Sequence, residues 1–123
     1  MAKRKKIIER RRQDRFKVKD GFFAALTSEN KIGQINEIGK RGLTFQYVDN
    51  GTSVKTSAQI DIFSTSYDFY LRNMPVKSIV DFEIDSTVPL SSLPMKQVNV
   101  QFGKMSSTQK MLLDFFLQKY TLK

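Results

Sequence analysis

Stretches in which apolar and polar residues alternate run through most of the chain, and a period of two is typical of strands with one buried face. The clearest stretch covers residues 43–48, where Leu43, Phe45 and Tyr47 alternate with other residues. The same criterion predicts six or seven short strands, with a bulge or turn at residues 20–21 inside the first. Their residues are 16–26, 32–38, 43–48, 60–63, 69–71, 76–84 and 95–102.

Turn-forming residues separate these strands at intervals of about 8 to 12 residues. Polar turns are expected at residues 27–30 and 72–73, a strong turn at 49–53, irregular polar chain at 54–59, and a proline-containing loop at 87–94. Short strands with this spacing favour a small antiparallel β-barrel, so the predicted fold class is mainly β.

The period changes near the C-terminus, where the pattern favours a helix. Ser106 followed by Gln109 resembles a capping box at a helix N-terminus. Apolar residues then recur at three- and four-residue steps: Met111, Leu112, Phe115, Phe116 and Tyr120. This predicts a C-terminal amphipathic α-helix over residues 106–120 with its apolar face packed on the sheet. The aromatic pairs at 69–70 and 115–116 are expected in the core.

The residue types that the chain lacks narrow its possible chemistry. The 123 residues, 40% of them hydrophobic, suit one domain with a real core, and neither cysteine nor histidine occurs. Disulfides, thiolate metal sites, a cysteine nucleophile and a Ser-His-Asp triad are therefore excluded. We expect no catalysis, no metal and no cofactor. No apolar stretch approaches the roughly 20 residues of a membrane span, and no secretory signal is apparent, so we expect a cytoplasmic protein.

The net charge of +9 is concentrated at the N-terminus. Residues 1–19 contain ten Lys or Arg and two acidic residues, a net charge of +8, so the remaining chain is nearly neutral. This distribution favours an anionic partner for the N-terminal segment: a nucleotide, a nucleic acid or an acidic membrane surface. The alternative is a solvated basic tail. We divide the chain into a basic flexible arm at 1–15 and one barrel domain at 16–123.

Two clusters contain the residue types that bind phosphate. Three arginines, Arg11, Arg12 and Arg15, precede the first predicted strand, and the turn at residues 37–42 contains a carboxylate, two glycines and two cations. Guanidinium groups pair with phosphate oxygens and with the O6/N7 edge of guanine. Turn glycines allow positive φ and close approach of a ligand to the backbone. Together they predict a phosphate-bearing ligand, although Glu37 paired with a neighbouring cation on the surface is an equally simple reading.

The chain resembles the PilZ domain, the bacterial receptor module for cyclic di-GMP. The family signature is an RxxxR arm followed further along the chain by a D/N-x-S-x-x-G turn between two strands. Here the arm matches at residues 11–15 and the turn at 37–42, and the late strand at 98–102 and the terminal helix fit the family's layout. The resemblance covers nearly the whole chain. Two positions depart from it, because Glu37 stands in place of Asp or Asn and Gly39 in place of Ser.

The resemblance implies a PilZ-like split barrel that binds cyclic di-GMP. Arg11 and Arg15 would hold phosphate and guanine, Glu37 would take the place of the acid that contacts guanine or arginine, and Gly42 would supply the turn. The full set of implied ligand-binding residues is Arg11, Arg12, Arg15, Glu37, Gly39, Arg41 and Gly42. The missing Ser hydroxyl and the longer acid each cost about 0.5–1.5 kcal/mol. We therefore expect binding weakened about 10- to 100-fold rather than abolished.

These observations favour a non-catalytic cyclic di-GMP receptor or adaptor in bacterial second-messenger signalling. Its arginine arm would close over the dinucleotide and signal to an unidentified protein effector. The alternative is a degenerate PilZ-like domain that binds no cyclic di-GMP and acts as a protein-interaction module. A nucleic-acid binder is less favoured, because no predicted strand has a clear row of exposed aromatic residues interleaved with cations.

Overall fold

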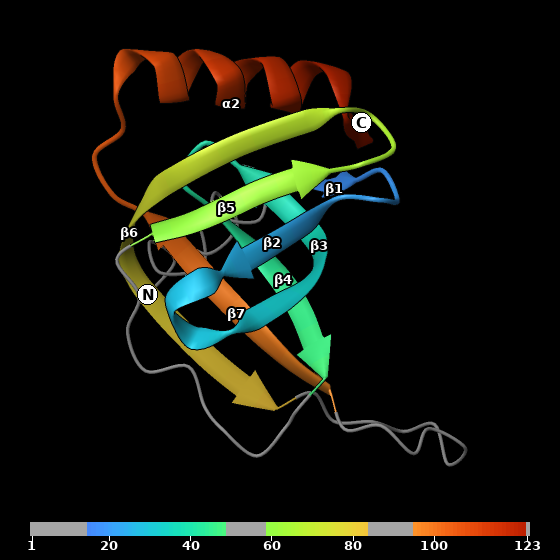
Figure 1. Ribbon diagram of the computed structural model, residues 1–123, viewed down its shortest axis with the longest axis vertical. Helices are drawn as coiled ribbons and strands as arrows, with labels where there is room; N and C mark the ends of the chain where they lie inside the picture. Colours follow the sequence, from blue (N-terminus) through green and yellow to red (C-terminus); the bar gives the residue numbers. More distant parts are fainter. Residues whose placement is uncertain (1–14, 49–58, 84–94, 123) are drawn as a thin grey trace, which may run out of the picture.

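The computed structural model describes residues 15–48, 59–83 and 95–122, which form a barrel of antiparallel strands with a helix across one end (Figure 1). Its elements are β1 (Arg15–Val18), β2 (Phe23–Leu26), the 3-10 helix η1 (Thr27–Glu29), β3 (Lys31–Gly39), β4 (Gly42–Val48), β5 (Gln59–Ser64), β6 (Phe69–Glu83), β7 (Met95–Phe102), α2 (Ser107–Lys119) and β8 (Thr121–Leu122). The turn expected at 49–53 and the loop at 87–94 lie outside the described residues. So does the irregular chain expected at 54–59, except for Gln59, which is the first residue of β5.

Six of the strands close into a ring. Their order is β2-β5-β6-β7-β4-β3, and β2 pairs again with β3 to complete the barrel. β1 also pairs with β3, at residues 37–39, whereas β2 pairs with residues 31–34, so β1 and β2 follow one another along the same neighbour. A turn containing Gly21 at φ 96° separates them. The predicted small antiparallel barrel with a C-terminal helix is confirmed, and β8 adds a short strand beside β1 that the sequence did not predict.

The prediction of a chain reversal at residues 72–73 is wrong. β6 continues through this point as a single strand of 15 residues, of which the first half pairs with β5 and the second half with β7. Its register shifts once against each neighbour, which is how a β-bulge absorbs an extra residue. Asn73 adopts φ 57°, a conformation that Asn tolerates better than most residues. The polar pair therefore marks a bend within one strand.

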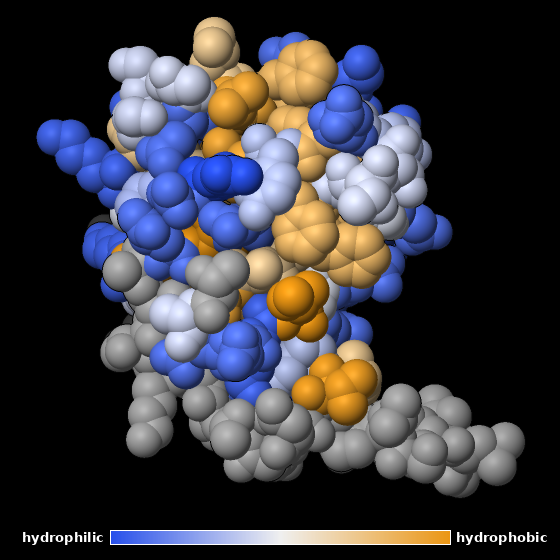
Figure 2. Space-filling view, viewed as in Figure 1, coloured by the Kyte–Doolittle hydropathy of each residue, from blue (hydrophilic) through white to orange (hydrophobic). Residues whose placement is uncertain are grey.

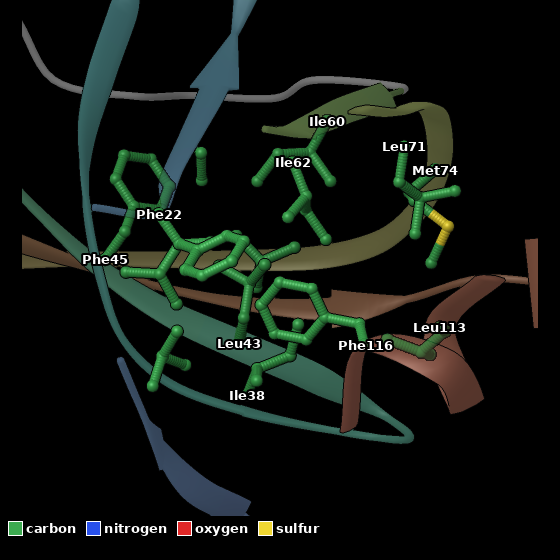
Figure 3. Close-up of a cluster of buried hydrophobic side chains, with 14 of the residues drawn as sticks. Phe22, Ile38, Leu43, Phe45, Ile60, Ile62, Leu71, Met74, Leu113 and Phe116 are labelled. Atoms are coloured by element: carbon green, nitrogen blue, oxygen red, sulfur yellow. The ribbon is translucent and has the colours of Figure 1, made fainter. Parts of the chain in front are cut away.

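The core fills the barrel and continues under α2 (Figure 3). Phe22, Phe45 and Phe116 are fully buried. The rings of Phe22 and Phe116 meet edge to face, with centroids 4.9 Å apart. Such a contact contributes about 0.5–1.5 kcal/mol beyond the area that it buries. The helix thus closes one end of the barrel with aromatic side chains, in agreement with the prediction that it packs on the sheet.

The N-terminus of α2 has the predicted capping box. The Gln109 backbone N–H donates to Ser106 Oγ at 3.1 Å, and the Ser106 N–H donates to Gln109 Oε1 at 2.9 Å. Gln109 Nε2 also donates to the Asn73 carbonyl oxygen at 2.8 Å. The cap therefore fixes the start of the helix against the bend in β6. None of the helices within the described ranges is long and apolar enough to cross a bilayer.

The apolar face predicted for α2 is partly wrong. Leu113, Phe116 and Leu117 are buried, and Tyr120 continues the same stripe, whereas Met111 and Phe115 belong to the exposed large hydrophobic residues. Apolar residues occupy two overlapping helical stripes in this segment, and the sequence alone does not show which stripe the barrel covers. The aromatic pair at 69–70 divides in the same way, because Phe69 is buried and Tyr70 is exposed.

Candidate functional site

The candidate site lies on the outer wall of the barrel, where β1, β3, β4 and β7 are neighbours. Leu43 and Phe45 point into the core, so Gly42 and Thr44 of β4 lie on the outer side. Residues paired directly across strands share a face, and the partners of Thr44 are Glu37 of β3 and Asn99 of β7. We call the following six residues the polar face: Arg15, Glu37, Gly39, Gly42, Thr44 and Asn99.

Arg15 is the arm arginine that the structure places on this face. It is the first residue of β1 and pairs with Gly39 of β3. Its Nη1 donates to Asn99 Oδ1 on β7 at 2.6 Å. The side chain therefore reaches from β1 across β3 and β4. A short bond between a charged donor and an amide oxygen is stronger than one between neutral groups.

Gly42 leaves the space through which Arg15 passes. A Cβ atom at this position would lie 2.9 Å from Arg15 Nη2 and 2.1 Å from the Val100 carbonyl oxygen. Both distances are too short, and the second conflicts with backbone that cannot rotate away. Gly42 is the first residue of β4, and Gly21 is the one described glycine with positive φ. The expectation that Gly42 supplies a turn conformation is therefore wrong: close approach is what requires glycine here.

A β-bulge turns Glu37 onto the polar face. The register between β3 and β4 shifts between Ile35 and Glu37, so Asn36 is the extra residue. Ile35 and Ile38 both point into the core despite their odd spacing, and Glu37 is left half-buried on the outer side. Within the described ranges the Glu37 side chain forms no ion pair with Lys40 or Arg41. Its carboxylate is thus placed beside Thr44, on the same face as the Arg15 guanidinium.

The remaining predicted site residues have different positions. Gly39 is buried at the end of β3, directly opposite Arg15. Arg41 is exposed in the turn after β3, and its carbonyl oxygen accepts from the Phe102 N–H at 2.7 Å. Arg11 and Arg12 lie outside the described residues. The structure therefore brings together Arg15, Glu37, Gly39 and Gly42, with Arg41 at the edge.

Asn99 is a member of the polar face that the sequence analysis missed. The alternation of β7 does place residues 97, 99 and 101 on the outer side, away from the buried Val98 and Val100. What the sequence does not show is the register, which sets Asn99 beside Thr44. Thr44 is only 5% exposed, although it lies on the outer wall. The side chains on this face are therefore closely packed rather than spread over an open sheet.

A second distinct surface lies on the outer side of β2, β5 and the first half of β6. Phe23, Phe63 and Tyr70 are directly paired across these strands, with ring centroids 5.9 Å and 5.8 Å apart. The Arg72 guanidinium lies 4.8 Å from the centroid of the Tyr70 ring. Figure 2 shows orange and tan side chains gathered in the middle of this side of the molecule. We call Phe23, Phe63 and Tyr70 the aromatic row.

A buried polar cluster inside the barrel is separate from both surfaces. Lys31 is 2% exposed, and its Nζ lies 4.8 Å from the centroid of the Tyr47 ring. Tyr47 in turn donates to Asp81 Oδ2 at 2.9 Å. Tyr47 thus links a buried cation to a half-buried carboxylate. Among the described residues, no group of three or more acidic side chains is arranged to bind a metal ion.

No protein-family model matches the chain, and no curated protein matches it in sequence. Two solved structures resemble it. One is described as MrkH, a c-di-GMP-dependent transcription regulatory factor, with a TM-score of 0.56 and 15% identity over 85% of this chain and 48% of that chain. The other is the PilZ domain of YcgR from Escherichia coli with c-di-GMP, with a TM-score of 0.54 and 12% identity over 85% of this chain and 86% of that chain.

These likenesses establish the fold of the chain as PilZ-like. The chain spans about half the length of the MrkH chain that it matches. At 12–15% identity the two structures support the arrangement of the strands and the helix, whereas the chemistry of the site has to be argued from the residues of this chain.

Proposed function

We propose that this protein is a non-catalytic receptor for cyclic di-GMP, which binds on the polar face beneath the arginines of the N-terminal arm. The observation that supports this most directly is the position of Arg15, whose guanidinium lies over Gly42 on the face that also presents Glu37. Arg15, the last residue of the arm motif, thus lies beside Glu37, Gly39 and Gly42 of the turn motif, from which it is separated in the sequence. Both structural neighbours are described with c-di-GMP.

The chemistry of the face suits this ligand. Cyclic di-GMP has two phosphates and two guanines, and a guanidinium pairs with phosphate oxygens and with the O6/N7 edge of guanine. A carboxylate such as that of Glu37 accepts from guanine N1–H and N2–H. Arg15 and Glu37 would therefore contact adjacent edges of a guanine, or one would bind phosphate and the other the base. Arg11 and Arg12 of the arm, with Arg41 at the edge, would supply the remaining positive charge.

Two substitutions relative to the family signature set the expected strength of binding. Gly39 lacks the Ser hydroxyl, which removes one hydrogen bond worth about 0.5–1.5 kcal/mol. Glu37 has one more methylene than Asp, which adds a rotamer to immobilise at about 0.5–1.5 kcal/mol. The predicted affinity is about 10- to 100-fold below that of a site with the full signature.

The receptor would act in the cytoplasm by presenting a new surface when the ligand is bound. An arm that closes over the dinucleotide changes what a protein effector meets at this side of the barrel, and a ligand with higher affinity for the closed form shifts the population toward it. This role needs no catalytic group.

Isothermal titration of cyclic di-GMP into the purified chain tests the proposal. The wild-type protein should release or absorb heat that saturates, and the Arg11→Ala/Arg15→Ala variant should not. Arg72→Ala is the matched control, because it removes an arginine from the opposite wall of the barrel. The absence of heat from the wild-type protein at several hundred micromolar ligand would rule out the receptor.

The aromatic row favours a second candidate, a domain that binds protein without a nucleotide. The row is partly exposed, and Ile32 nearby is 61% exposed. Apolar groups of this kind on the surface are typical of interaction sites. Asp61 faces Tyr70 and Arg72 stacks on it, so the row has no excess of cations for nucleic acid. A Phe63→Asp variant that loses a protein partner which the wild type binds in the absence of cyclic di-GMP would support this second function.

A further inference from the structure

The bond between Arg15 and Asn99 links the arm to a residue that belongs to neither part of the motif. Arg15 stands at residue 1 of β1 and Asn99 in the middle of β7, 84 positions further along the chain. Three strand spacings of about 4.8 Å separate β1 from β7. The Arg15 and Asn99 side chains bridge this distance together, so the arginine has to lie along the wall of the barrel.

Two glycines provide the path. Gly39 is directly opposite Arg15, and Gly42 is beneath the guanidinium, where a Cβ would lie 2.9 Å from Nη2. At Gly42 even a Cβ atom would lift the guanidinium away from the sheet. The two glycines therefore leave room for the Arg15 side chain to lie along the wall toward Asn99, and we call this room the glycine channel.

The chemistry of the two groups fixes the orientation of the Asn99 amide. A guanidinium has five N–H donors and no acceptor, so the atom that it contacts at 2.6 Å has to be Oδ1 rather than Nδ2. The amide thus serves as an acceptor toward the arm. Aspartate at the same position would keep the acceptor, whereas alanine would remove it.

We propose that Asn99 is a positioning residue for the ligand-binding arginine: it holds Arg15 across the glycine channel before the ligand arrives. This inference rests on the proposed function. An arginine has several rotatable bonds, and ordering it in advance lowers the entropy cost of binding. Loss of Asn99 should therefore weaken cyclic di-GMP binding about 3- to 10-fold through Arg15 alone.

In the opposite role, Asn99 would compete with the ligand for the Arg15 guanidinium. The two roles differ in sign. If Asn99 competes, Asn99→Ala tightens binding, and if it positions, the same change weakens it. The bond to Asn99 involves Nη1, and the five N–H donors of a guanidinium lie in one plane, a geometry that suits a two-point contact to phosphate or guanine.

A double-mutant cycle tests the positioning role. Cyclic di-GMP is titrated calorimetrically into the wild type, Asn99→Ala, Arg15→Ala and the double variant. The expected result is a 3- to 10-fold loss for Asn99→Ala in the wild-type background and no further loss when Arg15 is already alanine. Gln97→Ala is the matched control, since it shortens a side chain on the same strand and the same face without touching Arg15.

A measurement without ligand tests the contact itself. Side-chain ¹⁵N–¹H spectra should show restricted rotation of the Arg15 guanidinium in the wild type, its loss in Asn99→Ala, and its return in Asn99→Asp. An Arg15 signal that is the same in all three proteins would overturn the inference. Thermal unfolding curves of the same proteins show whether a variant has lost stability in general. Gln97→Ala shows whether the loss of any side chain on this strand changes the Arg15 signal.

The outcomes separate the inference from the proposed function. If the wild type gives no heat of binding, both the proposed receptor function and the positioning role are wrong. If the wild type binds, but the affinity losses of Asn99→Ala and Arg15→Ala add up, the positioning role is wrong and the receptor function stands. The same holds if Asn99→Ala binds more tightly than the wild type. Wild-type heat with full coupling between the two residues supports both.

Discussion

The two outer walls of this barrel are built from the same strand geometry but use it in opposite ways. On the polar face, Gly39 and Gly42 remove side chains from the wall, and a single long cationic side chain occupies the space. On the opposite wall, three rings stand in a row at 5.9 Å and 5.8 Å and fill the space between strands themselves.

The difference shows what each wall can bind. A wall cleared by glycines holds a guanidinium close to the sheet, where a flat ligand can meet it together with a carboxylate on the same face. A wall of rings packed against one another has little room for a base between them, and it offers apolar edges to another protein. Charge chemistry and apolar contact are thus kept apart on one small domain.

The largest effect should come from filling the glycine channel. Gly42→Ala places a Cβ 2.1 Å from the Val100 carbonyl oxygen, so the pairing of β4 with β7 has to shift. We expect the free energy of unfolding to fall by roughly 2–4 kcal/mol, as for other severe steric conflicts. Denaturant unfolding measures it. Gly103→Ala is the control, because its Cβ would meet Pro75 Cβ at 3.4 Å, and an equal loss in both variants would contradict the account.

A second comparison uses the same cation on the two walls. Arg15→Lys keeps the charge but removes the planar fork, and charge-assisted hydrogen bonds are worth about 1.5–3 kcal/mol. Cyclic di-GMP affinity should fall about 10- to 100-fold, as measured by calorimetry. Arg72→Lys, on the aromatic row, should leave the affinity unchanged. Equal losses for the two variants would mean that overall charge, not the polar face, binds the ligand.

The departure from the family signature offers a gain of function. Gly39→Ser restores the hydroxyl that the signature contains, and one added hydrogen bond should tighten cyclic di-GMP binding about 2- to 13-fold. Titration calorimetry measures it, with Gly39→Ala as the matched variant that adds a Cβ but no hydroxyl. Weaker binding by both variants would show that the space beside Arg15 matters more than the hydroxyl.

The smallest effect is expected on the aromatic row. Tyr70→Ala removes one stacked ring pair with Phe63 and the contact with Arg72 from an exposed position. The free energy of unfolding should fall by about 0.5–1 kcal/mol, and cyclic di-GMP affinity should not change. Thermal unfolding and calorimetry on the same protein measure both quantities. A clear loss of affinity would show that the two walls are coupled.

The sequence predicted local features better than pairings. The strand at 95–102 and the capping box at Ser106 were correct, because alternation and capping depend on neighbours a few residues apart. The prediction of a turn at 72–73 is wrong, because polar residues occur at a bulge and bend within a strand, as in β6, as well as at a chain reversal. The exposed side of α2 was misjudged, because two apolar stripes overlap around Phe115.

The candidate site was predictable in part for the same reason. Arg15, Glu37 and Gly42 were identified from motif spacing, and the structure places them on one face. Asn99 was not identified, since its place beside Thr44 depends on the register between β4 and β7. The aromatic row was also missed, because its members lie on three strands and no single strand contains the pattern.

The most direct test of the account is a titration of cyclic di-GMP into ¹⁵N-labelled protein, followed through backbone amide chemical shifts. The account predicts saturable shifts at the polar face, led by Arg15, Gly39, Gly42 and Asn99, with Phe63 and Tyr70 of the aromatic row unchanged. Shifts confined to the aromatic row, or none at several hundred micromolar ligand, would contradict it.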